Sequence, residues 1–218
     1  MTPESEKALA IIRKYVPKFC VKRKADTWHQ KLIGWLMKFN KSYMTNFYTT
    51  FGYTTYIPLG SDGAPWEWEV LCHEGRHGFQ AKLFTRPLFA LLYAIPAIFA
   101  LGFLGFGLFW SWWWGLGALF MLLPLPAIFR AMFEFDAFCV TMAVAYWENS
   151  EQVNDWFIDT HMIPHFTGPN YYFMWPFKKA LKYAFNAFKK DLESGAVLKD
   201  PYLADIHELC QELHAKAE

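Results

Sequence analysis

Apolar and polar residues recur along this chain with spacings that predict a mainly helical protein. Residues 6–40 carry apolar side chains at helical spacing and predict two amphipathic helices. Residues 48–60 are rich in Thr, Tyr and Phe and favour a strand. Residues 65–84 begin with a proline and two glutamates, which suit the first turn of a helix, and predict a helix that ends near Phe84.

The next segment, Pro87–Phe129, contains no charged residue. It is about twice as long as one helix needs to cross a bilayer. Glycines flank a tryptophan-rich centre at residues 110–115, which predicts two apolar arms joined by a turn at the membrane interface. We therefore expect a membrane-inserted helical hairpin over residues 87–129, either spanning the bilayer or dipping into it. A buried hairpin in a soluble core is the alternative.

The basic residues beside this apolar run predict its orientation. Lys82 and Arg86 precede it, Arg130 follows it, and its centre carries no Lys or Arg. Because cytoplasmic flanks of membrane segments are enriched in basic residues, both ends are expected in the cytoplasm. The prediction is a protein of the inner or cell membrane, with a transmembrane helix, a lipid-bilayer partner and its site facing the cytoplasm.

Beyond the apolar run, a helix is expected from Ala131 to about Trp147. A loop rich in Pro and Gly should follow over His161–Pro176, then a lysine-rich amphipathic helix and a polar tail. The fold class is therefore mainly α with a small β element. We expect a single domain over residues 1–218, with the hairpin inserted in it.

Composition and charge exclude some functions. The chain is 54% hydrophobic and 20% aromatic, and its formal net charge is only +1. A nucleic-acid partner is not expected, because no excess of basic residues is present to bind phosphates. The four cysteines are scattered without a CxxC pair, which argues against a disulfide framework or a cysteine zinc site.

The most specific motif is HEGRH at residues 73–77. On a helix, residues four apart share one face, so His73 and His77 can bind one metal ion. Glu74 then lies beside the ion, where it can take a proton from a bound water. The pattern predicts a Zn²⁺ site with His73 and His77 as ligands and Glu74 as the catalytic base.

A catalytic zinc takes three protein ligands and leaves one position open. Glu134 and Asp136 follow the long uncharged run in the segment RAMFEFDAF. They are two residues apart, about 200° around a helix, so only one of them can face the metal. Glu134 has a simpler alternative role, which is an ion pair with Arg130 one turn earlier.

HExxH, two apolar segments, and then a helix with E-x-[DE]-A resemble the integral-membrane gluzincins. These are the CaaX-processing prenyl endopeptidases and the bacterial heat-shock membrane protease. The resemblance covers roughly Thr49–Trp147 and includes the TTFGYTTYIP strand before the zinc helix. It implies a zincin-like α+β core and makes Glu134 the third ligand. The family commonly has Asp where Phe138 stands here, so the chain resembles a divergent, reduced relative.

The oxyanion formed in peptide hydrolysis needs a donor besides zinc. His165 and Tyr172, in the segment after the ligand helix, are the predicted donors. The expected activity is that of a zinc metalloendopeptidase acting on a peptide or protein substrate. Two alternatives remain: a non-enzymatic membrane or assembly protein with a structural metal site, and a zinc-dependent hydrolase of lipids or small molecules.

Overall fold

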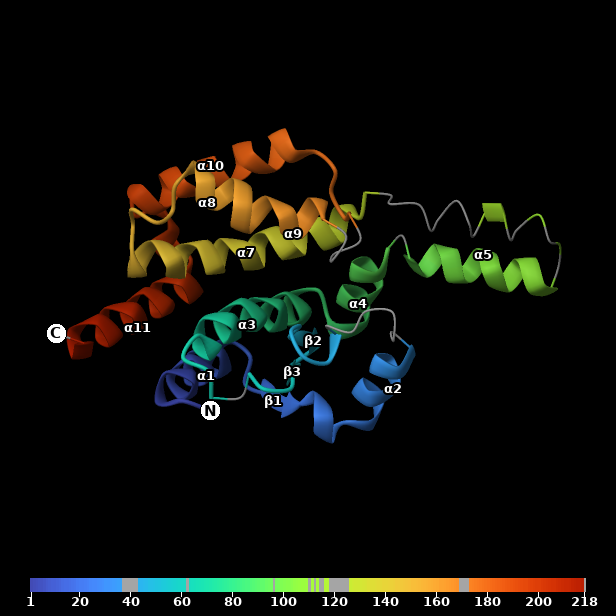
Figure 1. Ribbon diagram of the computed structural model, residues 1–218, viewed down its shortest axis with the longest axis horizontal. Coiled ribbons are helices and arrows are strands. Elements are labelled where there is room, and N and C mark those ends of the chain that lie inside the picture. Colours follow the sequence, from blue (N-terminus) through green and yellow to red (C-terminus); the bar gives the residue numbers. More distant parts are fainter. Residues whose placement is uncertain are drawn as a thin grey trace.

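The computed structural model describes residues 1–36, 43–61, 63–95, 97–109, 111, 113, 116–117, 126–168 and 173–217. It is mainly helical with a small three-stranded sheet, which confirms that part of the predicted fold class (Figure 1). One layer holds the N-terminal helix, the sheet and the HEGRH helix. A second layer holds most of the helices that follow residue 126, while the C-terminal helix contacts both layers.

The N-terminal part is less helical than its apolar spacing predicted. Residues 6–40 were expected to form two helices, but a strand and a short 3-10 helix lie between them. The short apolar stretch after Pro17 pairs with a distant strand, and local periodicity cannot report such pairing. The elements here are α1 (Pro3–Tyr15), β1 (Cys20–Arg23), η1 (Lys24–Asp26) and α2 (Trp28–Leu36).

The predicted strand segment forms a tight hairpin of two strands, β2 (Thr49–Phe51) and β3 (Thr54–Ile57). Gly52 turns the chain with a φ of 63°, a left-handed conformation that suits glycine. β3 pairs with β2 antiparallel and with β1 parallel, so the strand order is β1-β3-β2. This order leaves β2 at an edge of the sheet.

Two long helices form the centre of the molecule, and both agree with the sequence prediction. α3 (Glu67–Leu83) carries HEGRH, and α7 (Ile128–Glu148) carries Glu134. They pack against each other along their length. α4 (Arg86–Ala94) follows α3 and packs on both.

The predicted transmembrane helix is wrong. Among the described residues, no helix is both long enough and apolar enough to cross a bilayer. The apolar run is broken, because α4 ends at Ala94 and α5 (Ala97–Phe109) begins as a separate helix that projects from the body (Figure 1). A helix of 13 residues is about 20 Å long, short of a hydrocarbon core of about 30 Å.

The expected apolar hairpin over residues 87–129 is not seen in the described part of the chain. Most of its second arm, residues 118–125, lies outside the described residues. The predicted membrane localisation and cytoplasmic orientation depended on this hairpin.

The C-terminal part is more helical than predicted. Helical turns occupy the start of the expected loop, and the expected polar tail is a packed helix whose Tyr202, Ile206 and Leu209 are buried. This segment is buried because it packs against α1 and α7. Its polar composition gave no indication of that packing. The elements are α8 (Asp155–Phe157), a π-helical turn (Ile158–Met162), α9 (Ile163–Thr167), α10 (Lys178–Glu193), η5 (Ala196–Lys199) and α11 (Pro201–Ala217).

Candidate metal centre

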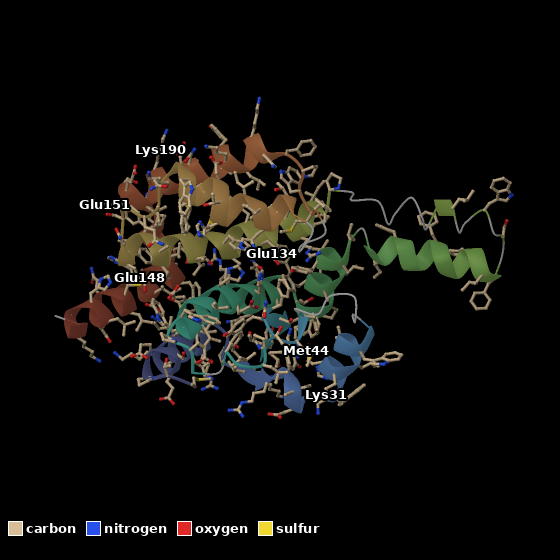
Figure 2. All side chains as sticks on the ribbon, viewed as in Figure 1. Lys31, Met44, Glu134, Glu148, Glu151 and Lys190 are labelled. Carbon is tan, nitrogen blue, oxygen red and sulfur yellow. The ribbon has the colours of Figure 1, made fainter. Side chains whose placement is uncertain are left out.

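Three side chains that can bind a metal ion converge between α3 and α7. His73 and His77 lie on one face of α3, and Glu134 reaches them from α7. One ligand atom from each lies within 4.8 Å of the others, and all three residues are buried. Figure 2 labels Glu134 at the level where α7 passes beside α3. This buried group can hold a metal ion.

The distances inside this group fit a metal ion better than hydrogen bonds. Glu134 Oε2 lies 3.8 Å from His73 Nε2 and 3.7 Å from His77 Nε2. Both separations are too long for hydrogen bonds, and the buried Glu134 Oε2 has no hydrogen-bond partner in the described part of the chain. A tetrahedral zinc with bonds of about 2.1 Å separates its ligand atoms by roughly 3.4 Å. The spacing of the two imidazoles and the carboxylate therefore suits a metal ion of this size.

Burial and mutual charge shift the pKa values of these three groups in different directions. Burial lowers the pKa of His73 to about 3, and the neighbouring His77 adds to the effect. Burial also opposes the charge of His77, but Glu134 overcomes it and raises the pKa of His77 to about 9. Burial opposes ionisation of Glu134 as well, yet His77 and His73 lower its pKa to about 2. Glu134 is thus an anion, and a metal ion would compete with a proton for His77.

Glu74 lies in the same cavity as the three ligands, with its carboxylate directed toward the sheet. Glu74 Oε2 accepts a hydrogen bond of 2.5 Å from Thr50 Oγ1 of β2. Burial raises the pKa of Glu74, while His77 and the Thr50 hydroxyl oppose that rise. A carboxylate with a raised pKa beside a metal is suited to accept and later return a proton.

One cavity of about 420 Å³ contains Glu74 and the three ligand residues. Its floor is α3, and its walls come from the β2 edge, from α4 and from the start of α7. The walls are largely aromatic, with one basic residue, Arg130. The other lining residues are Tyr43, Phe47, Tyr48, Thr49, Thr50, Phe51, Gly52, Phe89, Ala90, Tyr93 and Ala94.

The structure separates the two acids of α7. Glu134 joins the metal group, whereas Asp136 forms a two-pronged ion pair with Arg76, with N···O distances of 2.7 and 2.8 Å. This agrees with the expectation that only one of them can face the metal. Phe138, also on α7, packs its ring 4.8 Å from that of His73.

Of the two predicted oxyanion donors, the structure describes only His165, which lies on α9 beside the metal group but does not line the cavity. Its ring packs 4.7 Å from the Phe138 ring. Burial lowers the pKa of His165, Glu134 opposes that shift, and His165 in turn contributes to the lowered pKa of His73. The expected loop is helical at His165, which directs this side chain onto α7. Tyr172 lies outside the described residues.

Sequence reasoning missed several residues that contact the site. Tyr93 on α4 donates a hydrogen bond to Glu134 Oε1, and the guanidinium of Arg130 lies 5.1 Å from the centre of the Tyr93 ring. Both line the cavity. Tyr93 lies within the apolar run, and Arg130 directly follows it, where its charge was assigned to membrane orientation and to an ion pair with Glu134. The phenol and guanidinium groups are the polar signal that could have identified both residues as part of the site.

Comparisons of the chain with protein-family models, with curated proteins and with solved structures found no match.

Proposed function

We propose that this protein is a zinc-dependent metallopeptidase of the gluzincin type. The observation that carries the proposal is the convergence of His73, His77 and Glu134 with the Glu74 carboxylate in one cavity. The order of an HExxH helix, an apolar insertion and a second helix with the glutamate supports the likeness to the gluzincins.

Each residue has a role in this proposal. Bound zinc supplies a Lewis acid that polarises the scissile carbonyl and acidifies a water. Glu74 takes the proton of that water as its oxygen bonds to the carbonyl carbon, and then delivers it to the leaving amine as the C–N bond breaks. Thr50 holds the Glu74 carboxylate by its 2.5 Å hydrogen bond.

The position of β2 favours a peptide substrate. β2 is an edge strand, and its residues Thr49, Thr50 and Phe51 line the cavity that holds Glu74. An extended peptide can pair its backbone with such an edge, which would bring one peptide bond beside the catalytic groups.

A hydrolase of lipid or small-molecule esters is the second candidate. The aromatic walls of the cavity favour it, because they suit an apolar ligand that needs no backbone pairing. In ester hydrolysis, zinc and Glu74 would have the same roles as in peptide hydrolysis. A lipid-ester assay run beside a peptide library separates the two candidates.

Metal analysis of the purified protein beside a Glu74→Gln variant tests the proposal. We expect about one zinc per chain in both proteins, since the amide leaves all three ligands in place. Peptide hydrolysis should fall by at least about 100-fold in the variant, because the base is lost. Wild-type turnover by the variant would remove Glu74 from the mechanism. Stoichiometric zinc without hydrolysis of any peptide or ester would identify a non-enzymatic protein with a structural metal site.

A further inference from the structure

The two residues between Glu74 and His77 in the HEGRH motif, Gly75 and Arg76, lie against the start of the C-terminal helix. A Cβ at Gly75 would lie 2.4 Å from the hydroxyl oxygen of Tyr202, the second residue of α11. Arg76 Nη1 lies 2.8 Å from Asp200 Oδ2, just before α11 begins. Asp200 also accepts a hydrogen bond from the Tyr202 backbone, which fixes its carboxylate at the start of that helix. The metal-binding helix is thus tied to the start of α11 at its central turn.

A chain of polar contacts continues from Arg76 to His77. The guanidinium donates two hydrogen bonds to Asp136, and Asp136 Oδ2 accepts a third, of 2.8 Å, from Gln80 Nε2. Gln80 Nε2 also donates to the backbone carbonyl of Phe133, at 3.0 Å. Gln80 Oε1 lies 2.9 Å from His77 Nδ1. Gln80 is only 4% exposed, so water has little access to its amide.

These contacts determine the tautomer of His77. The Asp136 carboxylate, paired with Arg76, and the Phe133 carbonyl can only accept hydrogen bonds. The Gln80 amide must therefore turn its NH₂ group toward both of them and its oxygen toward His77. An oxygen acceptor at 2.9 Å requires a proton on Nδ1. Once a metal ion displaces the second proton, the neutral imidazole of His77 has its lone pair on Nε2, on the side of Glu134.

We propose that Gln80 and Asp136 are positioning residues for the metal ligand His77, with Arg76 and Asp200 holding Asp136 in place. The inference rests on the metal site proposed above. Gln80 selects the tautomer and the ring orientation of His77, and Asp136 prevents the Gln80 amide from flipping. Substituting a residue that hydrogen-bonds a metal ligand in this way commonly lowers metal affinity by about 10–100-fold.

The other histidine ligand provides an internal comparison. His73 Nδ1 lies 2.9 Å from the hydroxyl oxygen of Thr141. A hydroxyl can donate or accept, so Thr141 allows either tautomer of His73. His73 also hydrogen-bonds the Ala137 backbone carbonyl, which can only accept, so the backbone contributes to its tautomer, whereas the Gln80 side chain selects that of His77. His77 should therefore be more sensitive than His73 to substitution of its outer side chains.

The experiment measures Zn²⁺ affinity by competition with a chelator, together with the thermal stability of each metal-free protein. We expect Gln80→Leu and Asp136→Ala each to weaken Zn²⁺ binding by about 10–100-fold. Thr141→Val should weaken it less. Asp205→Asn is the matched control, because Asp205 ties α11 to Lys14 and Tyr15 of α1 without contacting Arg76. It should lower stability and leave the Zn²⁺ affinity unchanged.

Exchanging the two polar groups gives a second test that does not depend on a truncated side chain. In Gln80→Glu the new carboxylate faces Asp136, so Zn²⁺ binding should weaken. Adding Asp136→Asn places an amide NH₂ donor beside one oxygen of the new carboxylate at position 80. The other oxygen of that carboxylate can then accept a hydrogen bond from His77 Nδ1. The double variant should therefore recover part of the lost affinity.

The outcomes separate this inference from the proposed function. Wild-type protein that binds no Zn²⁺ would overturn the metal site, and the inference with it. Wild-type binding with unchanged affinity in Gln80→Leu and Asp136→Ala would overturn the inference alone. So would a double variant that binds no better than Gln80→Glu. Lower stability of the metal-free variants with unchanged Zn²⁺ affinity would show that the contacts serve only the fold.

Discussion

At the scale of single residues, Lys24 is unusual because a fully buried lysine lies near the site. Its Nζ donates a 2.7 Å hydrogen bond to the Tyr43 carbonyl and lies 3.8 Å from the centre of the Tyr43 ring. Burial lowers the pKa of Lys24 to about 8, although the negative charge of Glu74 opposes the shift. Tyr43 lines the cavity, so Lys24 supports one of its walls from behind.

This pKa predicts how stability changes at alkaline pH. Between about pH 8 and the ordinary lysine pKa of 10.5, the unfolded chain keeps a proton that folded Lys24 has lost. Because the unfolded state then binds more protons, the contribution of Lys24 to the free energy of unfolding rises with pH in this window. Chemical denaturation of wild type and Lys24→Met at pH 7, 8.5 and 10 checks this. The variant should lack that rise, and parallel pH profiles would contradict the prediction.

Glu134 and Asp136 should differ in metal content. Glu134→Ala removes a ligand and should abolish stoichiometric zinc, measured by elemental analysis after dialysis. Asp136→Ala retains all three ligands and should keep zinc at saturating concentrations, although it binds more weakly. If Asp136→Ala loses the metal and Glu134→Ala keeps it, the assignment of the third ligand is wrong.

At the scale of elements, α3 approaches α1 and α11 closely through Gly75. A Cβ there would lie 2.4 Å from the Tyr202 hydroxyl oxygen and 2.6 Å from Ile12 Cγ1, and both of these residues are buried. The Tyr202 hydroxyl is held by its 2.7 Å hydrogen bond to the Cys72 carbonyl. Neither neighbour can move away cheaply.

We therefore expect Gly75→Ala to destabilise the protein by about 1–3 kcal/mol, the usual cost of overpacking. Thermal and chemical denaturation measure it. Gly102→Ala on α5 is the control, because a Cβ at Gly102 meets nothing within 4 Å among the described residues. Alanine is the better helix former, so the control should be neutral or stabilising. An equally stable Gly75→Ala protein would show that the three helices can separate there.

The projecting helix α5 should be dispensable for metal binding. α4 contributes Phe89 and Tyr93 to the cavity, whereas α5 packs on α4 and extends away from the site. Replacing residues 97–125 with a flexible Gly-Ser linker should leave the Zn²⁺ affinity unchanged. Replacing residues 86–125 should weaken it, because Tyr93, the donor to Glu134, is also lost. Loss of binding in the shorter deletion would show that α5 belongs to the site.

At the scale of the whole molecule, the candidate metal site lies between the two layers of the fold. His73 and His77 come from the layer that contains the sheet, and Glu134 comes from the layer of α7. A metal that binds only the folded state adds about 4 kcal/mol at a free concentration 1,000 times its dissociation constant. For a chain of this size that corresponds to roughly 8–16 °C in melting temperature.

Melting curves with Zn²⁺ and with a chelator measure this linkage. Wild type should melt at a higher temperature with Zn²⁺, and Glu134→Ala should show little difference between the two conditions. An equal Zn²⁺ shift in both proteins would show that the metal binds elsewhere.

The sequence alone predicted what depends on neighbours within one helix. The i,i+4 spacing placed His73 and His77 on one face of α3, and the two-residue spacing of Glu134 and Asp136 excluded a shared metal. The bounds of α3 and α7 followed from the proline, the early glutamates and the apolar periodicity. All of these are local properties, because helix geometry relates residues only a few positions apart.

The tertiary structure alone decided which distant segments meet. It placed Asp136 against Gln80, Tyr93 on Glu134, and Asp200 against Arg76. It also packed α11 into the core, where its polar composition had suggested a tail. These contacts join residues that are far apart in the chain or hidden beside an apolar run. Periodicity reports which face of a helix is apolar, but the partner of that face is determined only when the helices pack.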